Sequence, residues 1–224
     1  MRRIVGTGLA AMTASLCLAG CASRAPFAYP QAAAPRAAGA GPLVGAMHAV
    51  CDRRADRSIG DVYEGDVHVA VSAALRHEML ASGAFARVEA LPGCAASPPL
   101  EALRAQGIDV LVQPSLDELR WVQPDHDQVA TTAFAIAVVA GAVGGVAYGL
   151  TDTEVFGRTE IQATIVDARH GTSETRTYNG EVRETLDKMR ADSEDTRREM
   201  AARSFAAAMQ AFRVDMAALA PPTP

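Results

Sequence analysis

Aromatic and basic residues are both in short supply in this chain of 224 residues. Phe, Trp and Tyr make up 5% of the sequence, with a single tryptophan, so we do not expect a deep aromatic platform for stacking sugars or bases. Lys and Arg number 21 against 26 Asp and Glu, which gives a net charge of −5. Because nucleic acids and anionic headgroups attract basic surfaces, this balance argues against both as main partners.

Catalytic motifs are missing as well. The sequence contains no Gly-x-Ser-x-Gly nucleophile elbow, no phosphate-binding loop and no zinc-protease helix motif. Among the five histidines, only His126 lies in a local cluster of ligand types, Asp125-His126-Asp127. Adjacent residues do not converge easily on one ion, and no second cluster has zinc spacing. We therefore predict no metal, no catalytic residue and no enzymatic activity, with a hydrolase only as a third hypothesis.

Charge is almost absent from the first twenty residues, where only Arg2 and Arg3 carry any. Residues 4–18 are mostly apolar or small, and Leu18-Ala19-Gly20-Cys21 closes the stretch. That order is typical of an export signal, and the segment is too short for a stable membrane span. The last four residues resemble the lipobox of bacterial lipoproteins. The resemblance implies cleavage before Cys21, which then carries diacylglycerol on its thiol and an acyl chain on its nitrogen. The alternative is an ordinary signal peptide with a chance cysteine.

A lipid anchor of this kind places a mature protein on a membrane without a spanning helix. Ala22 follows the cysteine, whereas in the sorting rule of bacteria with two membranes an aspartate there favours the inner membrane. We therefore expect the outer membrane, on its periplasmic side. Without residues 1–20 the chain keeps 26 acidic and 19 basic residues, because only Arg2 and Arg3 are removed, and its net charge is −7.

The stretch after the cysteine is rich in Ala, Pro and Gly and holds little to bury. We interpret residues 21–41 as the lipidated cysteine and a flexible tether. Residues 42–220 are enough for one periplasmic domain.

Two cysteines, Cys51 and Cys94, remain once Cys17 and Cys21 are assigned to the signal and the anchor. They lie in a compartment where disulfides persist, and each follows a predicted strand of the same sheet. If those strands are parallel, both cysteines lie at its carboxyl edge. We expect a disulfide between Cys51 and Cys94. Two separate buried thiols or a catalytic cysteine are the alternatives, although no histidine is placed beside either one.

Strands and helices are predicted to alternate in the first half of the domain. The expected strands are 43–51, 85–91 and 108–112, and Pro114 interrupts the third before it resumes toward Trp121. The first helix follows a cap at Asp66 and stops at Gly83. The second opens at Ser97-Pro98-Pro99 and ends at Gly107.

The second half is predicted to hold a hairpin and a long helix. Residues 158–167 alternate cleanly, and 172–182 return as their partner strand after the turn at Asp167–Gly171. The charged run 183–199 is interpreted as a solvated loop and helix face. The last helix, 193–219, carries one apolar stripe. The order β-α-β-α-β, insert, β-β-α predicts an α/β (α+β) layered domain with helices packed on a mixed sheet.

This order, together with three short motifs, resembles a group of envelope lipoproteins. The motifs are Leu80-Ala81-Ser82-Gly83 leading into Phe85, Gly107-Ile108-Asp109-Val110-Leu111-Val112, and Asp52-Arg53-Arg54-Ala55-Asp56. They are similar to parts of CsgG-like, TolB amino-terminal-like and YajG-type domains. The resemblance implies a periplasmic, non-enzymatic module that binds envelope proteins or builds assemblies, and it carries over no catalytic residue.

No residue from 128 to 151 is charged. Ala137, Gly141, Gly145 and Gly149 recur there at a spacing of four, which on a helix places them on one face open to close backbone approach. Four interpretations stay open: a helix in or on the membrane, close helix packing between copies in an oligomer, packing on the protein's own sheet, or a mobile loop. Glycine is costly in a water-exposed helix, so we expect this insert to contact something.

We therefore predict a non-catalytic, membrane-anchored lipoprotein that acts as an accessory or assembly subunit of a cell-envelope complex. Its expected partners are the membrane, through the lipid anchor, other envelope proteins and further copies of itself in a homo-oligomer, but not nucleic acid. No cofactor is expected beyond the covalent lipid on Cys21. The alternative is an auxiliary lipoprotein of an ABC-type lipid-trafficking system, which has the same lipobox and a similar mixed architecture.

Overall fold

The computed structural model describes residues 25–28, 41–57, 59, 63, 64, 66–94, 97–123 and 152–220. The predicted signal peptide, Cys21 and the apolar insert at 128–151 lie outside the described residues. Within the described ranges, no helix is both long and apolar enough to cross a membrane.

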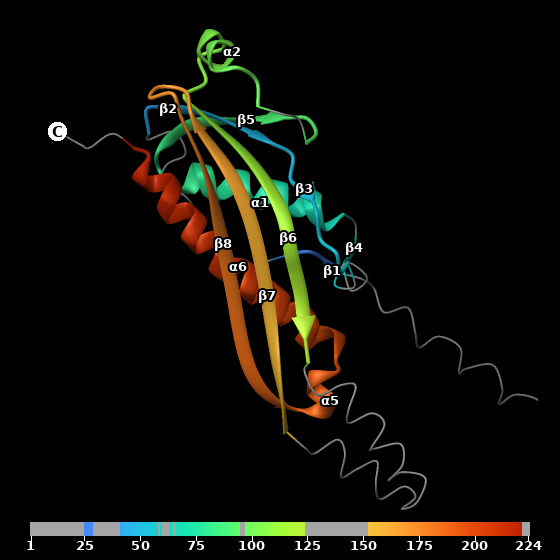
Figure 1. The fold of residues 1–224 in the computed structure, drawn as a ribbon. Coiled ribbons are helices and arrows are strands. Elements are labelled where there is room, and N and C mark those ends of the chain that lie inside the picture. Colours follow the sequence, from blue (N-terminus) through green and yellow to red (C-terminus); the bar gives the residue numbers. More distant parts are fainter. Residues whose placement is uncertain are drawn as a thin grey trace, which may run out of the picture.

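A mixed sheet forms the centre of the domain, with strands in the order β5–β2–β6–β7–β8 and the short β3 beside β6 (Figure 1). β2 lies parallel between β5 and β6, and β7 and β8 continue the sheet antiparallel. The strands span Leu43–His48 (β2), Cys51–Asp52 (β3), Phe85–Leu91 (β5), Val110–Val122 (β6), Asp152–Asp167 (β7) and Thr172–Asp187 (β8). The predicted mixed sheet with packed helices is confirmed.

Two long helices cover one face of this sheet (Figure 1). α1 (Val67–Ala81) and α6 (Glu194–Ala218) enclose the main core, in which Leu75, Phe205 and Phe212 are fully buried. The short α2 (Leu100–Ala105) packs on the opposite face through Leu103. α5 (Lys188–Ala191) is a single turn before α6. The opposite face is otherwise polar, as expected for an antiparallel sheet with one solvated side.

The predicted helix limits agree with the structure because local signals set them. Ser193 caps α6 by accepting a hydrogen bond from the Thr196 amide at 3.1 Å. Asp66 occupies the cap position of α1, although its side chain makes no capping hydrogen bond. Gly83 and Gly107 follow α1 and α2 with φ of 77° and 68°, a conformation that favours glycine.

β6 is continuous through Pro114, so the predicted interruption is wrong. Pairing with β2 ends at Met47↔Val112, and pairing with β3 starts at Cys51↔Ser115. Pro114 falls in the interval between the two partners while it pairs with Ala163 on β7. A missing backbone donor is tolerated where no ladder bond is required.

β7 and β8 are longer than predicted. They pair from Asp152↔Asp187 to Asp167↔Thr172, so residues 183–187 are strand and not the predicted loop. The alternation continues there, because Val155 and Leu186 face the core between exposed charges. Because the solvated side carries many charged residues, the alternation of buried and exposed residues is difficult to recognise in the sequence.

A second, two-stranded sheet lies beside the start of α1, where β1 (Ala25–Pro26) runs parallel to β4 (Tyr63–Glu64) (Figure 1). The predicted flexible tether at 21–41 therefore contains a segment, residues 25–28, that the structure describes and places against the domain.

Candidate functional site

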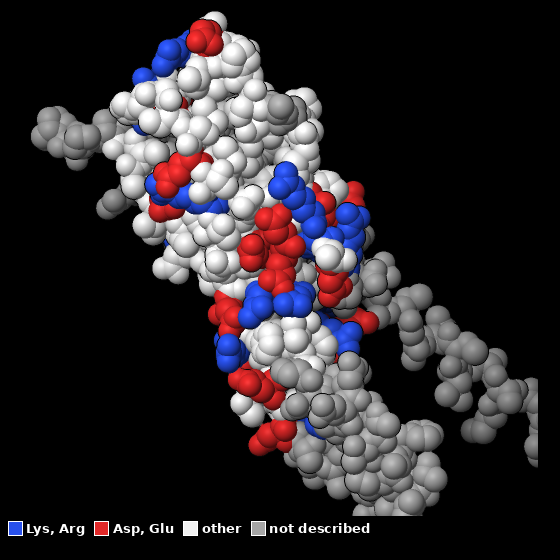
Figure 2. Space-filling model, in the orientation of Figure 1, with Lys and Arg blue, Asp and Glu red and all other residues white. Residues whose placement is uncertain are grey.

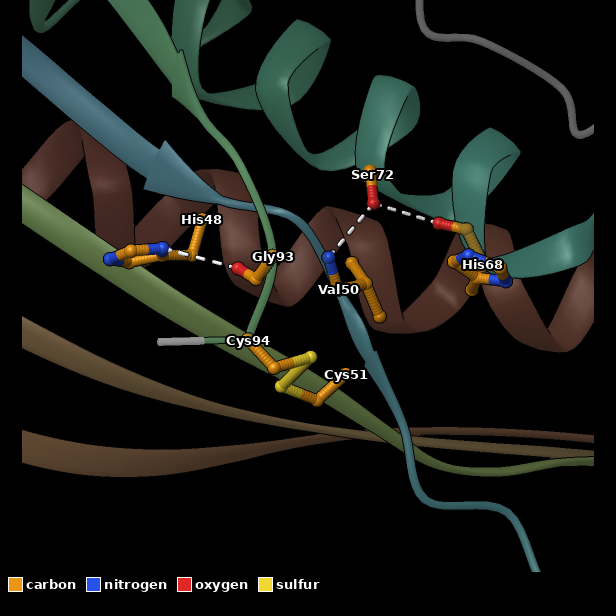
Figure 3. The surroundings of a disulfide bond; sticks show 7 residues. All are labelled: His48, Val50, Cys51, His68, Ser72, Gly93 and Cys94. Atoms are coloured by element: carbon orange, nitrogen blue, oxygen red, sulfur yellow. Dashed lines mark hydrogen bonds between the residues drawn. A yellow bond between two sulfur atoms is a disulfide. The ribbon is translucent and has the colours of Figure 1, made fainter. Parts of the chain in front are cut away.

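The predicted disulfide is present. Cys51 in β3 and Cys94 in the loop after β5 are bonded, with their α-carbons 5.5 Å apart (Figure 3). The backbone before Cys51 is fixed to α1, because the Val50 amide donates to Ser72 Oγ at 2.9 Å and Ser72 Oγ donates to the His68 carbonyl at 2.8 Å. Both cysteines follow parallel strands, as predicted, and the bond ties the two carboxyl ends together.

The bridge borders a polar cavity of about 340 Å³. β5 and β6 are the two neighbours of β2 in the sheet. The connection through α1 leads from β2 to β5 on one side of it, and the connection through α2 then leads from β5 to β6 on the other side. The carboxyl end of β2 is therefore a topological switch point, the usual ligand position in open α/β sheets. Residues from five segments line the cavity: His48, Ala49, Cys51, Arg53, Cys94, Ser97, Gln113, Pro114, Ser115, Gln162 and Thr164.

Hydrogen-bonding groups dominate the chemistry of this cavity. His48 is 6% exposed, and its Nδ1 lies 3.2 Å from the Gly93 carbonyl oxygen (Figure 3). Its Nε2 has no hydrogen-bond partner among the described residues. The hydroxyl of Ser97 donates to the Gln113 side-chain oxygen. Hydroxyls, amides and one guanidinium line the cavity, and no carboxylate is among the described lining residues. Such a lining can hold a small polar group.

A second feature is an aromatic clamp, which we define as Phe27, Tyr63 and Phe205. The Phe27 ring centroid lies 4.9 Å from that of Tyr63 and 5.2 Å from that of Phe205, both edge to face. The Tyr63 hydroxyl donates to the Arg198 carbonyl at 2.8 Å, and burial raises the pKa of Tyr63 to about 12. Edge-to-face pairs of this kind stabilise beyond their buried area. The clamp therefore holds the chain after β1 onto α6.

The clamp continues into the outward face of α1. Phe27 and Ala28 line a shallow cavity of about 460 Å³ together with α1 residues Ala70, Ala73, Ala74, Arg76, His77 and Leu80. Val69 on the same helix is 57% exposed. Small and apolar side chains make up most of this lining, and its polar groups are the Arg76 guanidinium and the His77 imidazole.

The outer edge of β8 is a third feature. β8 has 16 residues and pairs only with β7 among the described strands. Its exposed side chains carry both signs, and Arg176 and Arg183 form ion pairs with Glu174 and Glu181 at 2.7 and 2.6 Å. Figure 2 shows acidic and basic groups side by side on this view of the molecule, without a broad area of one sign. Charge on an open edge is a common protection against uncontrolled strand pairing.

Several predicted site residues fall outside the described part of the chain. They are Cys21, Ala137, Gly141, Gly145 and Gly149, and the Asp125-His126-Asp127 cluster lies outside it too. His68 and His77 both lie on α1, and no group of three or more His, Cys, Asp or Glu in the described ranges could hold a metal ion. The aromatic clamp was missed, and its one signal in the sequence is a lone phenylalanine in the Ala/Pro-rich stretch.

No protein-family model matches the sequence, and no curated protein matches it. Among solved structures, the chain is similar to the PelC dodecamer from Paraburkholderia phytofirmans at 12% identity, covering 82% of this chain and 91% of that chain, with a TM-score of 0.41. It is also similar to a homolog of neuraminyllactose-binding hemagglutinin from Helicobacter pylori, at 8% identity. That match covers 85% of this chain and 90% of that chain, with a TM-score of 0.48. The match to lipoprotein GNA1162 from Neisseria meningitidis has 10% identity, covers 64% of this chain and 84% of that chain, and has a TM-score of 0.33.

These neighbours thus include a bacterial lipoprotein. A relation to CsgG-like, TolB amino-terminal-like or YajG-type domains in particular is not shown. At these identities and TM-scores the likenesses support no conclusion about function.

Proposed function

We propose that this chain is a non-catalytic lipoprotein, anchored to the outer membrane through lipid on Cys21, that serves as an accessory or assembly subunit of a cell-envelope complex. The observation that carries the assembly role is the edge of β8. β8 is 16 residues long, and the backbone donors and acceptors on its outer side, away from β7, are paired by no described strand. An extended segment of a partner, or the same strand of a second copy, can add to such an edge through main-chain hydrogen bonds.

The disulfide supports the proposed location of the protein in the periplasm. Bonds of this kind persist in the periplasm and are rare in the cytosol, and Cys51–Cys94 closes a loop with a sequence separation of 43. The signal-like residues 1–20 and the lipobox-like Leu18–Cys21 supply the export and lipidation part of the proposal.

Site-specific crosslinking in cells tests the assembly role. A photo-crosslinking amino acid at Thr177 or Asn179, both exposed on β8, is expected to capture an envelope protein or a second copy of the chain. The same group at Val214, which is 62% exposed on α6, is the control and is expected to capture much less. Equal capture at both positions, or none at β8, would contradict a docking role for this edge.

The identity of the captured protein separates the two functions. Outer-membrane or periplasmic assembly proteins support the proposal. An inner-membrane transporter or its periplasmic chain would instead favour the auxiliary lipoprotein of a lipid-trafficking system.

A further inference from the structure

Very little chain separates the proposed lipid anchor from the aromatic clamp. Cys21 precedes Ala25 by four residues, and an extended chain spans at most about 3.6 Å per residue, so their α-carbons lie within about 14 Å of each other. Ala25 is fixed to the domain, because it pairs with Tyr63 and because Phe27 packs between Tyr63 and Phe205. A bilayer that holds lipid on Cys21 must therefore come close to the surface around β1.

The surface next to β1 is suited to such contact. The exposed positions of α1 are Val69, Ala73 and Arg76, which follow one another at helical spacing. The acidic residue inside this helix, Glu78, is 2% exposed and lies 3.6 Å from Arg213. The exposed positions of α1 therefore offer two apolar side chains and one guanidinium to a lipid surface, and no carboxylate from within Val67–Ala81. His68 and His77 on this helix are half-buried, and the exposed Asp66 lies just before its first residue.

The neighbouring helix is different. α6 begins with Glu194 and Asp195 and carries Glu199 in its next turn, all of them exposed and paired with arginines. Carboxylates of this kind favour water over the phosphate layer of a bilayer, because like charges repel. Of the two helices on this side of the sheet, α1 is the better match to lipid.

We propose that the outward face of α1, together with Phe27 and Ala28, rests on the surface of the bilayer to which the chain is anchored. This inference rests on the proposed lipidation of Cys21. It turns the opposite, polar face of the sheet away from the membrane, since α1 and that face lie on opposite sides of the strands (Figure 1). The open face is then free for partners in the periplasm.

Fluorescence quenching by lipid tests the orientation. Val69→Cys on α1 and Asn179→Cys on the open face of β8 introduce one free thiol each into the full lipidated chain, with the Cys51–Cys94 bond left oxidised. Each thiol is labelled with the same fluorophore, and the protein is placed in phosphatidylcholine vesicles that contain spin-labelled lipid. Quenching at residue 69 is expected to exceed quenching at residue 179 by at least about twofold. Equal quenching, or stronger quenching at residue 179, overturns the proposal.

Two further variants keep the test decisive. Arg76→Cys repeats the measurement on the same face if the labelled Val69 variant is less stable than the parent. Ten Gly and Ser residues inserted between Ser23 and Arg24 leave both the lipobox and β1 intact, and are expected to reduce the difference between residues 69 and 179. A difference that survives the insertion unchanged overturns the role of the short connection.

The anchor itself is measured separately, by the mass of the mature chain and by flotation with vesicles. Lipid mass and flotation without preferential quenching at residue 69 reject this inference alone. Absence of the lipid mass rejects the proposed anchoring, and the inference with it.

Discussion

Gly180 on β8 lies directly beneath the backbone of Ser204 on α6, so closely that a β-carbon at residue 180 would overlap the Ser204 carbonyl oxygen. Gly157 on β7 stands in the same relation to the Met200 carbonyl. Between them, the Thr159 and Ser204 hydroxyls are hydrogen-bonded at 2.8 Å, and both side chains are fully buried. The two glycines therefore allow α6 to pack in close contact with β7 and β8, because any side chain at residues 157 and 180 would overlap the helix backbone.

Gly180→Ala is expected to lower the free energy of unfolding by about 3 kcal/mol, because the added methyl group meets backbone atoms that cannot rotate away. Urea denaturation measures this. Asn179→Ala changes the preceding residue of β8, which is exposed. It is the control and is expected to change stability by less than about 0.5 kcal/mol. A near-neutral Gly180→Ala would show that α6 does not pack this closely.

Loss of the disulfide is expected to destabilise the domain by about 4 kcal/mol, from the loop-closure entropy of a loop with the observed separation of 43 residues. The double variant Cys51→Ala, Cys94→Ala reports this in urea denaturation. A reductant should destabilise the parent by a similar amount and leave the double variant unchanged. If reductant also destabilised the double variant, the effect would not belong to this bond.

Asp167 should make stability depend on pH in the acid range. Burial raises the pKa of its carboxyl, but hydrogen bonds from Arg169 at 2.7 Å and from His170 at 3.0 Å outweigh this and hold the pKa well below the ordinary 3.8. A group whose pKa is lower in the folded state contributes stability above its unfolded value, and loses it as the pH falls through the folded value. Unfolding free energy should therefore decline from about pH 4 downward.

Asp167→Asn is expected to lower stability at pH 7 and to flatten that acid decline, as followed by urea denaturation at a series of pH values. Asp66→Asn is the matched control, because Asp66 is exposed and makes no capping hydrogen bond. An unchanged acid profile in Asp167→Asn would contradict the assignment.

Phe27→Ala is expected to release β1 from the domain at a cost of about 1–2 kcal/mol, since the ring is partly buried and takes part in two edge-to-face contacts. Hydrogen exchange should speed up at the amides of Tyr63 and Glu64, which β1 pairs, and not in the β7–β8 ladder. Tyr63→Phe, which removes only the hydroxyl bond to Arg198, should cost about 1 kcal/mol and leave β1 in place. Unchanged exchange at Tyr63 in Phe27→Ala would show that the ring does not hold β1.

Local patterns in the sequence were sufficient for most of the elements. The cap at Ser193, the apolar stripe from Phe205 to Met216 and the glycine stops at residues 83 and 107 each act within a turn or two of chain. The disulfide was also predictable, because two parallel strands bring their carboxyl ends, and so Cys51 and Cys94, to the same edge.

Two features depended on partners far along the chain. Pro114 stays in its strand because the gap between β2 and β3 falls beside it, a fact of register that no local window contains. β7 and β8 extend to Asp152 and Asp187 because each is the other's partner, although their outer charges resemble a solvated loop. The predicted contact element at 128–151 lies outside the described residues and stays a prediction.

The sequence by itself determined the order of the elements, the export-like start and the expectation of a lipid on Cys21. Each of these depends on residues close together in the chain, namely charges, small residues and the spacing of apolar side chains. Only the tertiary structure decided that the chain after that cysteine is held within a few residues of the domain. Residues 22–41 contain no Val, Leu, Ile or Met beside which Phe27 could be buried, and the rings that pack against it come from residues 63 and 205. Folding alone brings those three together, and with them the side of the domain that we propose faces the membrane.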